Sequence, residues 1–271
     1  MQVGEFLHCG FDRLLCCKVA EQQLVDNEVV TGIQGLPGYE DPDNIYYYSF
    51  EDDGTCNGTI TGLFEMDGNT MYAVAGKLRT GWQTVINGAE LDYYYFDPAT
   101  GHAVDGVQTI DGYTYTFTNC ILTRGHLEKN SVGTRYMWAG VWLTREWVNI
   151  DGNISYAESD SYFRTGLEYK RDPVTAVVHL YVFDENGVWQ KDHTGLYDVD
   201  GKTYLVENGY VVEYPGLVKM GDDYYYFNSS HYMVKGRTYW ISKSNGYLPC
   251  QNYAFDADGK LILDAPVPPT T

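Results

Sequence analysis

A short unit whose first strand ends in an Asp-Gly or Asn-Gly pair recurs along this chain, and it limits the possible folds more than any other feature. The clearest copy opens at Gly62, and the next opens at Gly81 and runs to Gly106. These dipeptides tolerate positive φ at both positions, which is typical of two-residue hairpin turns. The pairs are Asp67-Gly68, Asn87-Gly88, Asp111-Gly112, Asp151-Gly152 and Asp200-Gly201. The pattern predicts β-hairpins repeated in tandem.

The composition agrees with a chain made of short strands and tight turns. The 271 residues include 29 Gly and 26 Tyr; tyrosine favours strands and glycine favours turns. One hairpin cannot bury its apolar face alone, whereas stacked hairpins bury it against their neighbours. We therefore predict an all-β fold, a β-solenoid of stacked β-hairpin repeats of about 20 residues each.

The repeats divide the chain into three parts. Residues 1–30 are expected to be a degenerate N-terminal repeat or cap, and residues 31–264 the tandem repeats. Residues 265–271 resemble a Pro-rich linker stub, which favours a longer parent protein with a covalently linked catalytic domain as one alternative. An insertion around Arg171–His179 lengthens one repeat.

Charge and motif content exclude several classes of function. The net charge is −19, from 37 acidic and 18 basic residues, and Lys and Arg do not cluster, so we expect no nucleic-acid partner. No apolar run is long enough to span a membrane. The six cysteines form no CxxC pair and are expected to be isolated thiols buried in strands. No catalytic residue, metal site or cofactor is predicted, because carboxylates and histidines are scattered without a motif.

The tyrosine runs place aromatic rings on both faces of a strand. In Tyr93-Tyr94-Tyr95, a period of two puts Tyr93 and Tyr95 on one face and Tyr94 with Phe96 on the other. One face packs the core of the hairpin, and the other is free to line a groove between successive hairpins.

The repeat resembles the cell-wall-binding repeat family. That family includes the choline-binding repeats of bacterial surface proteins and phage lysins, the glucan-binding repeats of glucosyltransferases, and the C-terminal repeats of large clostridial toxins. The stretch Gly81–Gly106 is similar to the choline-binding type and Gly216–Gly236 to the toxin type. The resemblance covers roughly residues 24–264 and implies a solenoid of stacked hairpins.

The resemblance also implies two kinds of ligand site. In choline-binding members, aromatic rings of adjacent repeats surround a quaternary ammonium, which points here to Trp82 with Tyr93, and to Trp147, where Glu146 replaces the opening glycine. Other copies lack the tryptophan, so a regular series of choline sites is not expected. They carry Leu63, Val107, Leu167, Leu196 and Leu217. Glucan-like members bind sugars in shallow grooves between repeats.

We therefore expect a non-catalytic binding module of a bacterial surface or secreted protein that anchors to cell-wall or extracellular glycan. The expected partners are a cell-wall polysaccharide, a glucan or a choline-bearing polymer. A choline-binding module, and a structural spacer or protein-binding adhesin, remain alternatives. No signal peptide is visible, which suggests a fragment. The candidate ligand-binding residues are Trp82, Tyr93, Tyr95, Tyr115, Trp142, Trp147, Tyr224 and Tyr226.

Overall fold

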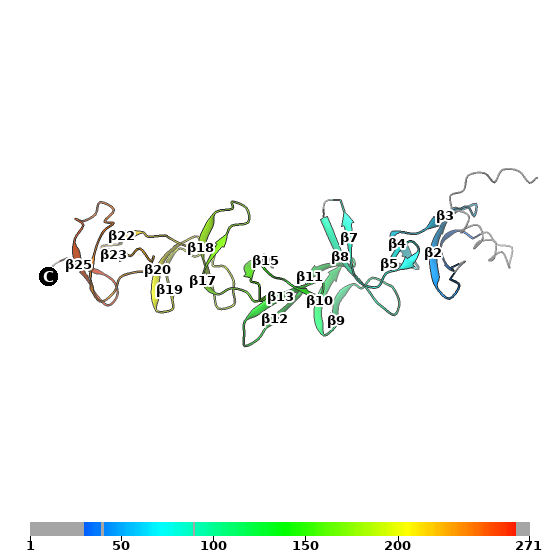
Figure 1. The fold of residues 1–271 in the computed structure, drawn as a ribbon, viewed down its shortest axis with the longest axis horizontal. Coiled ribbons are helices and arrows are strands. Elements are labelled where there is room, and N and C mark those ends of the chain that lie inside the picture. The colour runs from blue at the N-terminus through cyan, green and yellow to red at the C-terminus, as the bar shows by residue number, and fades with distance from the viewer. Residues whose placement is uncertain (1–29, 39–40, 89, 264–271) are drawn as a thin grey trace, which may run out of the picture. The chain divides into compact units, whose positions relative to one another are not determined.

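The computed structural model describes residues 30–38, 41–88 and 90–263. Every regular element in this part of the chain is a β-strand, and the strands form small antiparallel sheets (Figure 1). The all-β prediction is confirmed. The predicted linker stub, and the predicted N-terminal cap apart from Val30, lie outside the described residues. No helix in the described ranges is long and apolar enough to cross a membrane.

The chain divides into two compact units. The first comprises Met1–His126 with Met137–Val141, and the second comprises Leu127–Tyr136 with Trp142–Thr271. The strands at the boundary in sequence are β12 (His126–Lys129), β13 (Thr134–Trp138) and β14 (Val141–Trp142). We describe each unit by itself.

The first unit holds four further sheets, each built on an antiparallel hairpin. Their strand orders are β1-β2-β3, β4-β5-β6, β7-β8 and β11-β10-β9. The strands are β1 (Gly32–Pro37), β2 (Ile45–Phe50), β3 (Cys56–Thr59), β4 (Gly62–Met66), β5 (Asn69–Val74), β6 (Lys77–Leu78), β7 (Gly81–Asn87), β8 (Glu90–Phe96), β9 (Gly106–Ile110), β10 (Tyr113–Thr118) and β11 (Ile121–Arg124).

The second unit combines simple hairpins with one larger sheet. Two hairpins join in the five-stranded order β17-β18-β21-β20-β19, beside the sheets β15-β16, β22-β23 and β24-β25-β26. The strands are β15 (Glu146–Ile150), β16 (Asn153–Ala157), β17 (Gly166–Arg171), β18 (Val178–Phe183), β19 (Gly195–Val199), β20 (Lys202–Glu207), β21 (Tyr210–Val211), β22 (Gly216–Met220), β23 (Asp223–Phe227), β24 (Thr238–Trp240), β25 (Asn252–Phe255) and β26 (Leu261–Ile262).

Four of the five predicted turn pairs close hairpins, but Asn87 of the fifth pair belongs to β7 and pairs with Glu90, so that turn begins at Gly88. At Asp151 and Gly152, between β15 and β16, φ is 53° and 86°, as a primed two-residue turn requires. The other Asp-Gly pairs of the repeat also have positive φ at both residues. A two-residue turn fixes the register of its hairpin, so the side chains that oppose each other across β15 and β16 are set by the turn.

The tyrosine alternation is confirmed on β8. Tyr94 and Phe96 are buried, while Tyr93 and Tyr95 are half-buried. Within each unit, rings from successive sheets then pack together: Tyr72 of β5 stacks on Phe96 of β8 with ring centroids 6.0 Å apart. Side chains from β22, β23 and the strands that follow form another local core cluster around Tyr226. The buried core is thus distributed along the chain.

The cysteine prediction is wrong for the cysteines that the structure describes. Cys56 is buried in β3 as predicted, but it is disulfide-bonded rather than an isolated thiol. Cys120 and Cys250 are free, but neither is buried, and both lie in turns or loops. Absence of a CxxC pair therefore does not exclude a disulfide, because a disulfide does not require that spacing.

Candidate aromatic ligand site

Trp82 lies at the centre of an aromatic cluster in the first unit. On β7, Trp82 is opposite Tyr95 of β8, and their ring centroids are 5.2 Å apart. Two rings of the next hairpin, Tyr115 and Phe117 on β10, contact the same indole at 5.0 Å and 5.8 Å. The expected partner Tyr93 is instead opposite Thr84, and its ring contacts Trp138 at 6.0 Å. The structure therefore brings together Trp82, Tyr95 and Tyr115.

Trp147 repeats this arrangement in the second unit. It is opposite Tyr156 across the β15–β16 hairpin, with ring centroids 5.3 Å apart. Tyr181 and Phe183 of β18 contact it at 4.8 Å and 6.1 Å. Tyr156 and Tyr181 were not predicted as site residues. A sequence signal for Tyr181 does exist, because the spacing Tyr181-Val-Phe183 matches Tyr115-Thr-Phe117.

The two clusters differ in what covers the indole. In the first unit, the turn at Gly140 lies against Trp82, such that a Cβ atom on Gly140 would be 2.9 Å from Trp82 Nε1. The Tyr115 hydroxyl donates to Met137 Sδ at 2.8 Å in the same region. These contacts pack the Trp82 cluster.

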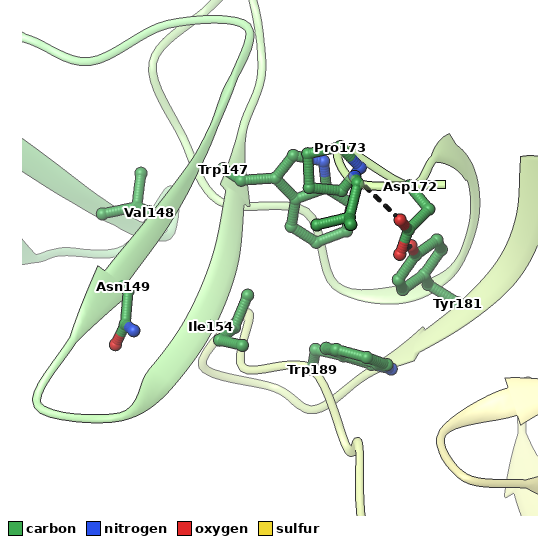
Figure 2. Close-up of a pocket in the computed structure, with 9 residues that line it drawn as sticks. Trp147, Val148, Asn149, Ile154, Asp172, Pro173, Tyr181 and Trp189 are labelled. Atoms are coloured by element: carbon green, nitrogen blue, oxygen red, sulfur yellow. Dashed lines mark hydrogen bonds between the residues drawn. The ribbon is translucent and has the colours of Figure 1, made fainter. Parts of the chain in front are cut away.

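In the second unit, a cavity of about 290 Å³ opens beside Trp147. We call it the Trp147 pocket. In Figure 2, Trp147 and Trp189 line it, with Tyr181 and Ile154 beside them. Its lining residues are Trp147, Val148, Asn149, Ile154, Asp172, Pro173, Val174, Tyr181 and Trp189. Trp189 was not predicted, because it follows Gly187 by two residues and so lacks the opening Gly-Trp pattern.

The polar tips of the three rings are engaged by protein groups. Trp147 Nε1 donates to the carbonyl oxygen of Arg171 at 3.2 Å, and Trp189 Nε1 donates to that of Gly209 at 3.0 Å. The Tyr181 hydroxyl donates to Asp172 Oδ2 at 3.3 Å. The rings therefore offer the pocket their carbon faces and edges, not their hydrogen-bond donors.

Burial and hydrogen bonds set the protonation states of Tyr181 and Asp172, which line this pocket. Burial raises the pKa of Tyr181, with the neighbouring Tyr210 as a further cause, so the phenol stays neutral. Hydrogen bonds from the backbone N–H groups of Thr175 and Val174 lower the pKa of Asp172, against a smaller effect of desolvation. One carboxylate thus remains ionised at the rim near neutral pH.

A lysine lies over the ring of Tyr156, the residue opposite Trp147 in the β15–β16 hairpin. Lys170 Nζ lies 4.4 Å from the centroid of the Tyr156 ring and 2.7 Å from Glu158 Oε2. Arg164 Nε lies 3.4 Å from the same carboxylate oxygen. The cluster is mostly buried, since only 13% of the Lys170 side chain and 22% of the Glu158 side chain are exposed.

Acid should weaken this cluster. The hydrogen bond from Lys170 is the main cause that lowers the pKa of Glu158. A carboxyl whose folded-state pKa is depressed stabilises the fold above its unfolded pKa and loses that effect as the pH falls through the folded pKa. We expect Glu158→Gln to destabilise the protein by about 1 kcal/mol at pH 7. Urea unfolding should show this difference shrinking towards pH 3. A pH-independent difference would contradict the assignment.

The remaining predicted rings make intramolecular contacts. The Arg135 guanidinium carbon lies 3.8 Å from the Trp142 ring centroid, and Glu128 accepts hydrogen bonds from Arg135 Nε and Nη2 at 3.0 Å and 3.1 Å. The face of the Trp142 ring is therefore covered by Arg135, a cation of the same protein. The Tyr224 ring contacts Tyr247 at 5.6 Å.

Tyr226 is a core residue. It is 1% exposed, and its hydroxyl lies 3.1 Å from Ser242 Oγ and 3.3 Å from the Tyr214 hydroxyl. Desolvation raises its pKa, but these hydrogen bonds outweigh that effect, so its pKa is lowered overall. The three hydroxyls connect β23 to the segments that contain Tyr214 and Ser242.

A second hollow in the same unit is polar. It measures about 580 Å³ and lies between the hairpins β17–β18 and β19–β20; we call it the polar groove. Four carboxylates line it, from Glu168, Asp184, Glu185 and Asp200, and that of Asp184 accepts hydrogen bonds from the backbone N–H groups of Asn186 and Val188 at 2.9 Å and 2.8 Å. The groove is lined by Thr165, Gly166, Leu167, Glu168, Phe183, Asp184, Glu185, Tyr197, Val199, Asp200, Lys202 and Tyr204.

No protein-family model matches the chain, and no curated protein matches it. Solved structures do resemble it. Choline binding protein F from Streptococcus pneumoniae is 18% identical, with a TM-score of 0.43, over 87% of this chain and 72% of that one. CbpJ from S. pneumoniae TIGR4 is 19% identical, with a TM-score of 0.31, over 87% and 72% of the two chains. The pneumococcal cell-wall endolysin from phage Cp-1, complexed with choline, is 25% identical, with a TM-score of 0.34, over 52% and 38%. Because these TM-scores lie below 0.5, we base the function on the residues of this chain.

Proposed function

We propose that this chain is a non-catalytic binding module that holds a quaternary ammonium group, such as the choline of a cell-wall polymer, in the Trp147 pocket. The observation that supports this function is the state of Trp147, Tyr181 and Trp189, whose polar tips are all engaged by protein groups. A ligand there meets aromatic carbon surfaces and forms no hydrogen bond with these rings. A quaternary ammonium needs none, and aromatic faces attract it by cation–π interaction.

The charge of the chain supports the same ligand. Asp172 places an ionised carboxylate at the rim, and the net charge of −19 raises the local concentration of cations. A neutral sugar would gain nothing from either charge. It would also find few free hydrogen-bonding groups among the residues that line this pocket.

Calorimetric titration with choline tests the proposal. We expect a saturable, one-site heat that persists at about 0.5 M NaCl, where attraction by exposed surface charge is screened. Trp142→Ala is a matched control, because this indole lies in the same unit but contacts Arg135 instead of the pocket. Absence of saturable binding by folded protein would overturn the proposal.

The polar groove favours glycan binding as a second function. Sugar sites combine an aromatic or apolar surface with polar groups that bind hydroxyls. The groove offers Tyr197 and Leu167 together with the carboxylates of Glu168 and Glu185. A glycan array of wall polysaccharides and glucans should give binding that Tyr197→Ala removes and Trp147→Ala retains. Equal loss in both variants would exclude the groove as a separate site.

The repeated hairpins and the disulfide at Cys56 suggest the setting of the module. We propose that the hairpins stack as a solenoid, since ring contacts such as Trp147–Tyr181 connect successive hairpins within a unit. Disulfides persist in oxidising compartments, which favours a secreted or surface-exposed protein. If the protein were a structural spacer whose rings only pack, neither the choline titration nor the glycan array would detect binding.

A further inference from the structure

The loop at residues 172–177 is longer than the two-residue turns that close most of the described hairpins. It joins Arg171 of β17 to Val178 of β18. Its conformation is held by hydrogen bonds: Asp172 Oδ1 accepts the N–H groups of Val174 and Thr175 at 2.9 Å and 2.7 Å. Arg171 Nη1 donates to the carbonyl oxygen of Ala176 at 3.0 Å. The loop is therefore a defined rim of the Trp147 pocket.

This rim exposes apolar side chains to solvent. Val174 lines the pocket and is nevertheless 90% exposed, and Val177 and Val178 are 51% and 48% exposed. Pro173, which also lines the pocket, is exposed as well. Figure 2 shows Pro173 beside Trp147 at this edge. A ligand held in the pocket thus reaches solvent across an apolar edge.

We propose that the partner at this site is a phosphatidylcholine-bearing membrane surface. The Trp147 pocket takes the quaternary ammonium of the headgroup, and Pro173, Val174 and Val177 enter the boundary between headgroups and acyl chains. A hydrated polymer would leave Val174 in water, whereas a bilayer covers it. This inference rests on the proposed function, because it requires the pocket to hold a quaternary ammonium.

The charge of the chain selects the kind of membrane. With a net charge of −19, the protein is repelled by anionic lipid surfaces. A phosphatidylcholine surface is zwitterionic and carries no such penalty. Phosphatidylethanolamine is also zwitterionic, but its primary ammonium is strongly hydrated and needs hydrogen-bond acceptors. The rings of the pocket supply no such acceptor, and the carboxylate of Asp172 already accepts hydrogen bonds from Val174, Thr175 and Tyr181.

Vesicle flotation with the whole chain tests the inference. We expect binding to phosphatidylcholine vesicles, weaker binding when phosphatidylethanolamine replaces much of that lipid, and no binding to phosphatidylglycerol. Val177→Asp should weaken vesicle binding at least about tenfold, because a charge replaces the inserted side chain. Val132→Asp is the matched control, since Val132 is 72% exposed in the same unit but lies outside the loop at residues 172–177. Because Val177 does not line the pocket, Val177→Asp should keep its affinity for free choline, so a loss specific to vesicles reports insertion.

Three results would overturn the lipid inference. These are equal loss in Val177→Asp and Val132→Asp, unchanged vesicle binding by Trp147→Ala, and absence of vesicle binding by protein that binds soluble choline. The last result would leave the proposed function intact. Failure to bind both vesicles and soluble choline would instead contradict the proposed function itself.

Discussion

Trp147→Ala is expected to raise the Kd for choline at least about 30-fold, because it removes a ring face worth roughly 2 kcal/mol to a desolvated cation. The indole also contacts Tyr156, Tyr181 and Phe183. Its loss therefore affects both the surface and the shape of the pocket. Trp147→Phe keeps a ring at this position and should recover part of the affinity. The measurement is the calorimetric titration, with unfolding curves to confirm that each variant is folded.

Trp142→Ala removes a tryptophan that does not line the pocket, so it shows whether a loss of binding requires a pocket ring. Trp142 stacks on Arg135, which Glu128 also holds. We expect this variant to lose some stability and to keep the affinity for choline. If Trp142→Ala and Trp147→Ala weakened binding equally, the ligand would not lie in the pocket described here.

Gly209→Ala is expected to give the largest loss of stability among conservative substitutions in the second unit. Gly209 has φ of 75°, and a Cβ atom there would clash with Trp189 Nε1 and lie 2.6 Å from the carbonyl oxygen of Gln190. Backbone strain and overpacking together should cost roughly 3 kcal/mol or more. Because Gly209 accepts the hydrogen bond from Trp189, the change should also weaken choline binding.

Gly201→Ala is the matched control for the clash. Gly201 lies in the same five-stranded sheet with φ of 71°, but a Cβ atom there would meet nothing within 4 Å. Only the strain of positive φ remains, about 1 kcal/mol. Urea unfolding of both variants measures the difference. Equal losses would show that the close packing of Gly209 on Trp189 contributes nothing.

Local signals in the sequence predicted the hairpins well. Asp151-Gly152 requires positive φ at both positions, and a two-residue turn then fixes the register, which places Trp147 opposite Tyr156. The same count from Asn87-Gly88 gives Tyr93 as the partner of Trp82, but Asn87 pairs with Glu90 within the sheet, so the turn begins at Gly88 and the partner is Tyr95. The turn pair therefore predicted the cross-strand partner of Trp147 but not that of Trp82.

The Trp147 pocket depends on features that local patterns do not contain. The loop at residues 172–177 carries no Asp-Gly pair, and its shape comes from hydrogen bonds to Asp172. Trp189 enters the site through an isolated bridge with Phe183 and a hydrogen bond to Gly209. The pairing of Tyr181 with Tyr210 joins two hairpins into one sheet. Such non-local contacts are set by tertiary packing, which explains why the sequence indicated aromatic grooves but not this pocket.

A comparison of choline with its neutral isostere tests the central claim most directly. In 3,3-dimethylbutan-1-ol a carbon atom replaces the quaternary nitrogen, so size and shape are kept while the charge is lost. At about 0.5 M NaCl we expect choline to bind the wild-type chain at least about tenfold more tightly, because the rings of Trp147, Tyr181 and Trp189 attract the cation. Equal affinity for the two compounds, or preference for the neutral one, would contradict a quaternary ammonium site.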